Sequence, residues 1–411
     1  MADGLMKVMD ASEHALWELP EVPGRGELPG RLLYATSARL GGSGLDVTSL
    51  EGALAAERGG FLGRVLAYAD GQREIPGGKV RTLPLQPARL LSFLGSERYY
   101  GAKKQWLDRV AAWELGRGGY DFLHTWSGDG WRSLVAAAER GIPSVMDIPT
   151  WHRNKGKVKR YETKSEREAG KLRGWERWRH GMLVSRQVML MEYELATLLL
   201  MPSSCSMATF EAAGMGRERL HYVGRGVDPG RFVPSEPEGR VRFVFVGALI
   251  RRKGVHRLLE AWRRLGMRDA ELVLVGTAHD EVRAELRDAP GNVRVTGFVK
   301  DVRAELRGAS AFVFPSECEG FAKATLEAAA CGLPLIATRE SGDAVVDGVP
   351  GWVVPADDVD ALAGAMEMAV RDRGEMAARG AAARRHVERW FTWDHYRLRL
   401  LAAYAKAREK Y

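Results

Sequence analysis

Short apolar runs alternate with segments of helical periodicity along most of the chain. The runs predict strands, and the segments in which apolar residues recur at three or four positions predict helices. Strands are predicted at 32–35, 80–83, 122–124, 144–147, 198–204, 243–246, 272–275, 293–296, 311–314 and 335–337. Helices are predicted at 130–139, 209–214, 255–264, 280–287 and 302–306. Strands that alternate with helices in this way build doubly wound parallel sheets, so an α/β fold is predicted.

The length of 411 residues favours two domains. A stretch rich in Pro and Glu, 234–239, is the predicted linker between them. We therefore expect a loosely packed lead-in segment, an N-terminal domain, a C-terminal domain and a final helix, over residues 1–30, 31–233, 240–383 and 384–411.

The rest of the chain is organised around the stretch 311–337. A strand ends at Pro315-Ser316, Glu319-Gly320-Phe321 follow, and an Ala-rich helix runs through Glu327. The loop lies at the carboxyl edge of the sheet, where open α/β sheets bind ligands. Free N–H groups near Gly320, Phe321 and Ala322 would suit a phosphate, and the two carboxylates, eight residues apart, would suit sugars on either side. The expected ligand is therefore a nucleotide-sugar.

These residues resemble the Glu-x7-Glu signature of the retaining GT-B glycosyltransferases, specifically glycosyltransferase family 4 (glycosyl transferases group 1). The matching groups, in chain order, are Pro315-Ser316, Glu319-Gly320-Phe321, Leu326-Glu327-Ala328 and Cys331-Gly332-x-Pro334. The resemblance implies two Rossmann-like doubly wound domains facing a central cleft, with the C-terminal helix crossing back to the first domain. It also implies that Glu319 holds hydroxyls of the donor sugar, that Glu327 holds the ribose, and that Leu326 belongs to the donor site.

Two other segments of the second domain resemble the family's donor site. Residues 247–254, from Gly247 through Lys253, are similar to its Gly-Arg-Leu-x-x-x-Lys-Gly phosphate loop, which implies that Lys253 neutralises the leaving diphosphate. Ala248 stands at the arginine position, and either Arg251 or Arg252 would supply the missing guanidinium. The segment Gly297-Phe298-Val299 resembles the one that reads the nucleobase through backbone groups.

In the first domain the resemblance points to both substrates. Gly41-Gly42 stand where the family has a glycine loop facing the donor phosphates and the acceptor. His124 and Trp126, in a pattern similar to Asp-x-x-His-x-His, and His152 after the next strand are the acceptor-side candidates. Two departures lie further on: Arg225 replaces an Asn of the interdomain passage, and Ser341-Gly342-Asp343 replace a Gly-Gly-x-x-Glu segment.

The implied reaction transfers a hexose-type sugar, with retention, from a nucleotide diphosphate donor such as a UDP- or GDP-sugar to a hydroxyl of a glycan, lipid or small molecule. Lys253, Glu319 and His152 are the catalytic candidates. No metal and no cofactor other than the donor are expected, since no ligand cluster is found. Two alternatives remain open: an inverting GT-B enzyme or epimerase with His152 as general base, and a catalytically silent nucleotide-sugar binding subunit.

Charge and composition bear on where in the cell the protein is expected. Lys and Arg number 61 against 53 Asp and Glu, a modest excess that alone does not predict nucleic-acid binding. Much of it lies in the basic region 153–186, which is either a surface helix packed on the domain or a peripheral contact with an anionic membrane. Three cysteines without metal spacing and no apolar run of about 18 residues favour a cytoplasmic protein, peripheral at most at the inner face of the membrane.

Overall fold

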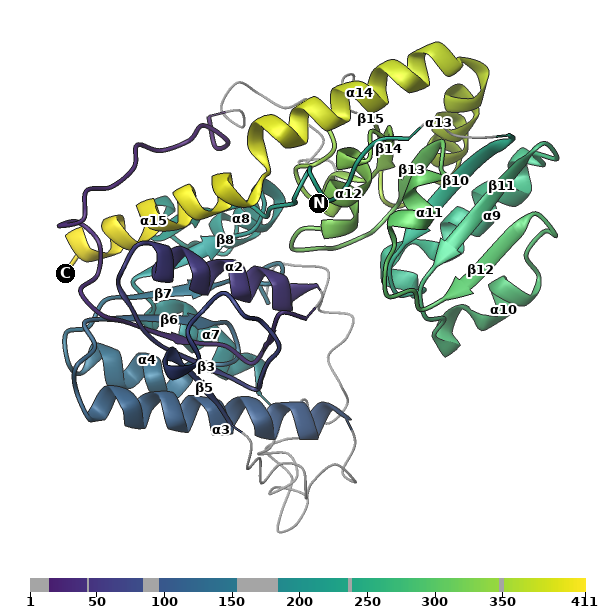
Figure 1. The fold of residues 1–411 in the computed structure, drawn as a ribbon. Helices are drawn as coiled ribbons and strands as arrows, with labels where there is room; N and C mark the ends of the chain where they lie inside the picture. Colours follow the sequence, from purple (N-terminus) through teal and green to yellow (C-terminus); the bar gives the residue numbers. More distant parts are fainter. Residues whose placement is uncertain (1–14, 43, 84–95, 154–183, 236–238, 347–350) are drawn as a thin grey trace, which may run out of the picture. The chain divides into compact units, whose positions relative to one another are not determined.

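The computed structural model describes residues 15–42, 44–83, 96–153, 184–235, 239–346 and 351–411 (Figure 1). They form two compact units, each described by itself below. One unit contains Leu19–Pro202, Met207–Val223 and Arg397–Tyr411, and the other contains Ser203–Ser206, Gly224–Tyr396 and the described part of Met1–Glu18. Most of the basic region 153–186, for which a packed surface helix and a peripheral membrane contact were the two alternatives, lies outside the described residues. None of the described helices is long and apolar enough to cross a bilayer.

The unit that contains Gly224–Tyr396 is built on a six-stranded parallel sheet in the order β12-β11-β10-β13-β14-β15. Its strands β10 and β13 are neighbours although two other strands, β11 and β12, lie between them in the sequence. Strands β11 and β13 are buried on both faces, as expected for parallel strands covered by helices. The strands span Val241–Val246 (β10), Ala270–Val275 (β11), Val293–Gly297 (β12), Ala311–Phe314 (β13), Leu335–Ala337 (β14) and Gly351–Val353 (β15).

Among the described residues, the helices that belong wholly to this unit are α9 (Val255–Leu265), α10 (Arg283–Arg287), α11 (Arg303–Arg307), α12 (Lys323–Ala330), α13 (Val359–Arg371) and α14 (Arg373–Trp390). From β10 the chain moves outward through β11 to β12 and then returns to β13 on the other side of β10. Because parallel crossovers are right-handed, α9 and α10 lie on one face of the sheet and α12 lies on the other. Helix α13, which follows β15, packs against α9, and α14 packs against α12 (Figure 1). The direction changes between β10 and β13, so the loops that follow these two strands flank the crevice in which such sheets bind ligands.

The other unit has a seven-stranded parallel sheet in the order β5-β3-β1-β6-β7-β8-β9, with its change of direction between β1 and β6. A small second sheet pairs β2 (Arg39–Leu40) with β4 (Ala69–Asp70). The strands of the large sheet are β1 (Leu32–Ala35), β3 (Leu62–Ala67), β5 (Val80–Thr82), β6 (Phe122–Trp126), β7 (Ser144–Asp147), β8 (Leu198–Met201) and β9 (Leu220–Tyr222). The helices are α2 (Leu45–Arg58), α3 (Ser96–Gly116), α4 (Trp131–Ala138), α7 (Arg186–Leu195) and most of α8 (Ser204–Glu211).

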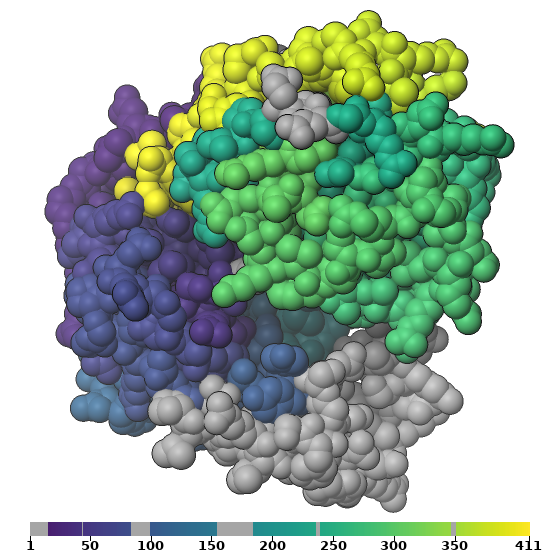
Figure 2. Space-filling view, turned by 45° about the vertical axis from the view of Figure 1, so that its right-hand side comes forward, coloured from purple at the N-terminus to yellow at the C-terminus, as the bar shows by residue number. Residues whose placement is uncertain are grey.

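The C-terminal helix predicted over 384–411 is interrupted. Helix α14 ends at Trp390, and α15 spans Trp393–Glu409. The carbonyl of Phe391 accepts the N–H of Val227 at 2.9 Å, and the hydroxyl of Thr392 accepts the N–H of His395 at 3.3 Å. These bonds compete with the helical ladder and cap α15, so α14 ends and α15 begins as a separate helix. Side chains of these C-terminal helices, in the yellow range of the colour bar, are exposed on the face shown in Figure 2.

The described part of the lead-in segment is anchored, which corrects the expectation of loose packing. The indole of Trp17 is fully buried. It packs edge-on against His386 and Phe391, with ring centroids 4.9 and 5.7 Å away, and lies 6.4 Å from the ring of Trp390. Trp17 is therefore a core residue of the six-stranded unit, although about 220 residues separate it from the first strand of that sheet.

Candidate functional site

Two loops of the six-stranded unit meet at its switch point. The loop after β10 ends in a short 3₁₀ helix, Arg251–Lys253, and then in Gly254 with φ of 73°. A Cβ atom on Gly254 would lie 2.0 Å from the carbonyl oxygen of Pro315, in the loop after β13. The two loops are also joined by the Glu317 N–H, which donates to the Arg252 carbonyl at 2.9 Å. Glycine at 254 is thus required both for the left-handed backbone and for the close approach of the loops.

This approach places two cations on the carboxylate of Glu319. Its Oε1 lies 3.1 Å from Nζ of Lys253 and 3.0 Å from Nη1 of Arg252, and it accepts the hydroxyl of Ser316 at 3.3 Å. The ammonium of Lys253 also lies 4.9 Å from the centroid of the Phe314 ring. All three charged side chains keep part of their surface in water. The cations are therefore fixed in position and still accessible to an anionic ligand.

The two candidate arginines lie in different surroundings. Arg251 turns toward the segment before α10: its N–H donates to Oε1 of Glu281 at 3.0 Å, and its guanidinium forms an ion pair with Glu285. Arg252 donates to Glu319 and to the carbonyl of Cys318. Of the two arginines, Arg252 contacts Glu319 and Arg251 does not.

The backbone donors after Glu319 differ from the expectation at one position. The N–H of Ala322 is not free, because it donates to the carbonyl of Ser341 at 2.8 Å. Ser341 belongs to the 3₁₀ helix Arg339–Ser341, which lies alongside this loop and also accepts the Glu319 N–H at its Glu340 carbonyl. Within the described residues, the N–H groups of Gly320 and Phe321 have no acceptor. The expected set of donors is therefore Gly320 and Phe321, without Ala322.

Glu327 lies two turns away, on α12. Its Oε1 is 3.9 Å from Nζ of Lys323. Burial raises the pKa of the Glu327 carboxyl, and the charges of Lys323 and Arg231 act in the opposite direction. The side chain of Leu326, by contrast, is fully buried in the core, so the expectation that it contacts the donor is wrong. Leu326 lies on the inner face of α12 and packs in the core, while the adjacent Glu327 points to a different side of the same helix.

The third predicted donor segment follows β12. The carbonyl of Gly297 accepts the N–H of Gly276 at 2.9 Å, which ties the ends of β12 and β11 together. The ring of Phe298 is 76% exposed. An aromatic ring of this size left in water at the carboxyl edge of the sheet is available to a ligand.

The acceptor-side candidates of the seven-stranded unit are buried. His124 is completely enclosed: its ring nitrogens lie 2.7 Å from the hydroxyl of Tyr404 and 2.9 Å from Oδ2 of Asp147. This corrects its prediction as an acceptor contact, because both nitrogens are used inside the unit. Trp126 is buried as well and donates to the hydroxyl of Tyr34 at 3.3 Å. His152 is 6% exposed and packs against Phe210 and Tyr193, with ring centroids 4.8 and 5.3 Å away.

Gly41 and Gly42 form a tight turn directly after β2. The N–H of Gly42 donates to the carbonyl of Arg39 at 3.1 Å, and a Cβ on Gly42 would meet the carboxylate of Asp46 at 2.0 Å. That carboxylate accepts the N–H of Arg39 at 3.1 Å. Asp46 thus holds the turn from inside, and the role of Gly41 and Gly42 at the donor phosphates stays a prediction.

A buried acidic group at the switch point of the seven-stranded sheet was not predicted. The carboxylate of Glu192 accepts the N–H groups of Gly128 and Gly130 at 2.6 and 3.2 Å, and burial raises its pKa to about 7. Asp129, between the two glycines, accepts the Ser37 N–H at 2.8 Å and pairs with Lys104 at 2.8 Å. Asp129 could have been found from its place after a predicted strand, whereas nothing in the sequence around Glu192 indicates its partners.

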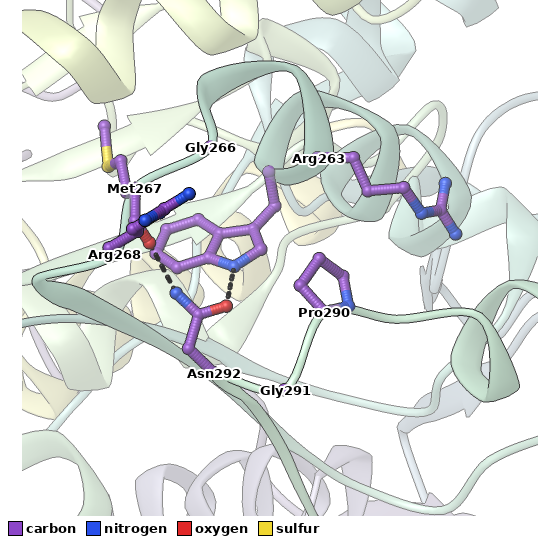
Figure 3. A pocket seen from close by; sticks show the side chains of 8 residues that line it. Arg263, Gly266, Met267, Arg268, Pro290, Gly291 and Asn292 are labelled. Carbon is purple, nitrogen blue, oxygen red and sulfur yellow. Dashed lines mark hydrogen bonds between the residues drawn. The ribbon is translucent and has the colours of Figure 1, made fainter.

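A surface hollow of about 330 Å³ lies elsewhere in the six-stranded unit (Figure 3). It is lined by the end of α9 and by residues 290–292, which lead into β12. Asn292 accepts the indole N–H of Trp262 at 3.0 Å and donates to the Ala270 carbonyl at 2.9 Å, so its polar groups are satisfied by the fold. The hollow lies at the amino ends of β11 and β12, opposite to the edge where Lys253 and Glu319 meet, and we regard it as structural.

Residues 240–372 match the family model described as "Glycosyl transferases group 1". Over 220 residues the chain is 34% identical to a D-inositol 3-phosphate glycosyltransferase of Kribbella flavida, a match that covers 46% of this chain. The chain spans about half the length of that relative, 52%.

Solved structures agree over a longer part of the chain. Sucrose-phosphate synthase from Thermosynechococcus elongatus superimposes with a TM-score of 0.70 at 18% identity, covering 93% of this chain and all of that one. HepE of Anabaena, in complex with UDP-glucose, gives a TM-score of 0.65 at 18% identity over 91% of this chain and 98% of its own. At such identities the likeness concerns the fold. Together with the two parallel sheets it confirms the predicted α/β fold class, GT-B with two Rossmann-like domains.

Proposed function

We propose that this chain is a glycosyltransferase that moves a hexose-type sugar from a nucleoside diphosphate sugar to an acceptor hydroxyl, a proposal supported by the match of residues 240–372 to the glycosyl transferases group 1 model. In this proposal residues 240–383 bind the donor and residues 31–233 bind the acceptor. The observation that supports it most directly is the meeting of Lys253, Arg252 and Glu319 at the switch point of the six-stranded sheet.

Each of these groups has a role that its chemistry suits. Lys253 and Arg252 neutralise the leaving diphosphate, and the N–H groups of Gly320 and Phe321 donate hydrogen bonds to its oxygens. Glu319 accepts hydrogen bonds from hydroxyls of the donor sugar and, before the donor arrives, holds both cations in place. Glu327 accepts hydrogen bonds from the hydroxyls of the ribose. Charge that develops on the leaving group is thereby stabilised by side chains fixed in advance, with no metal required by the proposal.

The family resemblance favours retention at the anomeric carbon. The bond from that carbon to the phosphate oxygen breaks and the bond to the acceptor oxygen forms on the same face. The acceptor proton passes to the leaving phosphate, so no protein nucleophile takes part. The inverting alternative needs His152 as general base, and the packing of this ring against Phe210 and Tyr193 gives that role less support. The anomeric configuration of the product, measured by NMR, separates the two mechanisms.

The first donor to test is UDP-glucose, since HepE, a protein of the same fold, was solved with that ligand. GDP-sugars remain the second series. Acceptors should include small phosphorylated polyols, because the relative from Kribbella flavida is named for D-inositol 3-phosphate. Glycans and lipids form the remaining acceptor classes of the proposal.

The experiment measures the thermal unfolding midpoint of the purified protein against UDP-, GDP- and ADP-sugars and their free nucleotides, in EDTA. A ligand that binds only the native state raises the midpoint. We expect one nucleotide series to raise it, and Lys253→Ala and Glu327→Ala to abolish the shift. Arg251→Ala is the matched control that should keep it, because Arg251 pairs with Glu281 and Glu285. No shift with any nucleotide would contradict the proposal.

A further inference from the structure

Helix α3 separates its acidic residues from its arginines. It is an outer helix of the seven-stranded unit (Figure 1), and its inner side packs against α4, β1 and β3. Within 99–116 both acidic residues, Asp108 and Glu114, are buried, with 3% and 5% of their surface exposed. Arg109 is exposed, and so is Arg117, directly after the helix. A helix with its acids inside and its arginines outside presents positive charge to its surroundings.

The two buried carboxylates are used inside the unit. Asp108 accepts two N–H groups at the start of α4, at 2.8 and 2.9 Å. Glu114 pairs with Arg64 of β3 at 3.1 Å and with Arg81 of β5 at 2.6 Å. Among the described residues, no acidic side chain pairs with either exposed arginine of α3. The positive charge on the outer side of the helix is therefore not offset.

Two tryptophans lie on the same side of α3 as the exposed arginines. Trp106, Arg109, Trp113 and Arg117 follow each other at intervals of three or four residues, so they form one line, about 16 Å long at 1.5 Å per residue. The side chain of Trp113 is 51% exposed. The guanidinium of Arg117 lies 4.7 Å from the centroid of its ring, and that of Arg81 lies 5.6 Å away. The ring and its flanking cations therefore lie together at the surface.

This combination suits the headgroup layer of an anionic membrane better than a protein partner. Tryptophan favours the boundary between water and hydrocarbon, and arginine binds phosphate oxygens. In a protein interface the exposed ring would be desolvated together with its guanidinium groups, which is costly unless each cation meets an acid. At a membrane the ring enters the boundary while the cations stay among hydrated phosphates.

We propose that this side of α3 docks on anionic lipid headgroups at a membrane surface. The docking face consists of Trp106, Arg109, Trp113, Arg117 and, from the neighbouring edge strand β5, Arg81. It contains no residue of the basic region 153–186. Docking would bring residues 31–233, proposed above to bind the acceptor, to lipid acceptors. That consequence rests on the proposed function, whereas the docking itself does not.

The test is the partition coefficient of the protein, measured by centrifugation with vesicles of phosphatidylcholine that contain about one third phosphatidylglycerol, at about 0.1 M salt. Each arginine near an anionic surface should strengthen binding about fivefold. We therefore expect Arg109→Gln/Arg117→Gln to weaken binding about tenfold or more, and Trp113→Ala to weaken it as well. The matched control is Arg283→Gln/Arg287→Gln, which removes two exposed arginines from α10 and should change binding less than about threefold.

A third variant separates charge from folding. Arg109→Lys/Arg117→Lys keeps both charges and should bind vesicles like the wild type. All variants should also keep the wild-type unfolding midpoint and its shift with the donor nucleotide. A loss of vesicle binding with that shift unchanged supports docking independently of the proposed function.

Several results would overturn the proposal. One is equal binding to these vesicles and to pure phosphatidylcholine, and another is an equal loss in the α10 control, which would mean that only net charge matters. A third is a wild type that binds no vesicles. If variants of the docking face instead lost binding to a single-stranded oligonucleotide, or changed the oligomeric state in sedimentation, the occupant would be a nucleic acid or a second copy of this chain, and the membrane assignment would fail.

Discussion

Arg251 and Arg252 are adjacent in sequence and have different partners. Because Arg252 reaches Glu319 and Arg251 pairs with Glu281 and Glu285, we expect Arg252→Ala to weaken nucleoside diphosphate binding by about 1.5–3 kcal/mol, the value of a hydrogen bond to a charged group. Arg251→Ala should change it little. Isothermal titration of both variants with the nucleotide found by thermal shift checks this. An equal loss in the two variants would mean that both guanidinium groups reach the diphosphate.

Glu192 makes the stability of the protein depend on pH. The folded protein holds the proton of this carboxyl up to a pKa of about 7, whereas the unfolded chain releases it near the ordinary value of 4.5. A raised pKa of an acid means that the folded state loses stability as pH rises between these values. The free energy of unfolding should fall by about 1 kcal/mol per pH unit in this window, and Glu192→Gln should remove that slope. Urea unfolding from pH 4.5 to 7.5 measures both, and parallel curves for the two proteins would contradict the assignment.

At the residue scale the sequence indicated individual charged residues, but not the partners that surround a residue in the fold. The spacing of strand, loop and helix indicated Glu319 and Glu327, and the resemblance to the family's phosphate loop indicated Lys253. His124 and Ala322 were misjudged because their partners come from distant parts of the sequence. Tyr404 and Asp147 enclose His124, and Ser341 takes the Ala322 N–H. A local pattern contains no information on such partners.

At the element scale, the loop after β10 depends on Gly254. Gly254→Ala adds a Cβ that meets the Pro315 carbonyl at 2.0 Å, so the loops that hold Lys253 and Glu319 must separate. Gly266→Ala is the matched control: Gly266 also has a left-handed backbone, with φ of 55°, and nothing lies within 4 Å of its added Cβ. The control should lose about 1–2 kcal/mol in urea unfolding from backbone strain. Gly254→Ala should lose more and should also lose nucleotide binding. Equal losses in the two variants would show that the contact with Pro315 has no effect.

Several buried strands with a strong apolar pattern were predicted with their limits, whereas the end of helix α14 was not predicted. The strands at 311–314 and 335–337 are observed at those residues, because buried parallel strands are continuous apolar runs. The break after Trp390 was missed, since helical periodicity continues through Phe391-Thr392. A backbone bond from Val227, more than 160 positions earlier, is part of what interrupts the helix there. Competition of this kind between local propensity and tertiary contacts is invisible in one segment of sequence.

On the scale of the whole molecule, the six-stranded unit depends on a residue near the N-terminus. Trp17→Ala removes an indole that is fully enclosed by His386, Trp390 and Phe391 and their neighbours. We expect a loss of about 3–5 kcal/mol in the stability of this unit, seen as a lower urea midpoint of its transition. Val22→Ala, at a residue that is 69% exposed in the same segment, should change the midpoint little. A midpoint for Trp17→Ala equal to that of the control would contradict the anchoring.

The anchoring of Trp17 has a consequence for recombination between related enzymes. Consider a chimera of two related proteins that is joined once, at residues 234–239. Its six-stranded sheet would come from one protein and its first 18 residues from the other. The Trp17 indole would then pack against an α14 from a different protein. The six-stranded unit would also lose the aromatic side chain with which its own α14 evolved. A functional chimera therefore requires that the N-terminal segment come from the same parent as the six-stranded unit, so its construction should place one junction after Glu18 and another at residues 234–239.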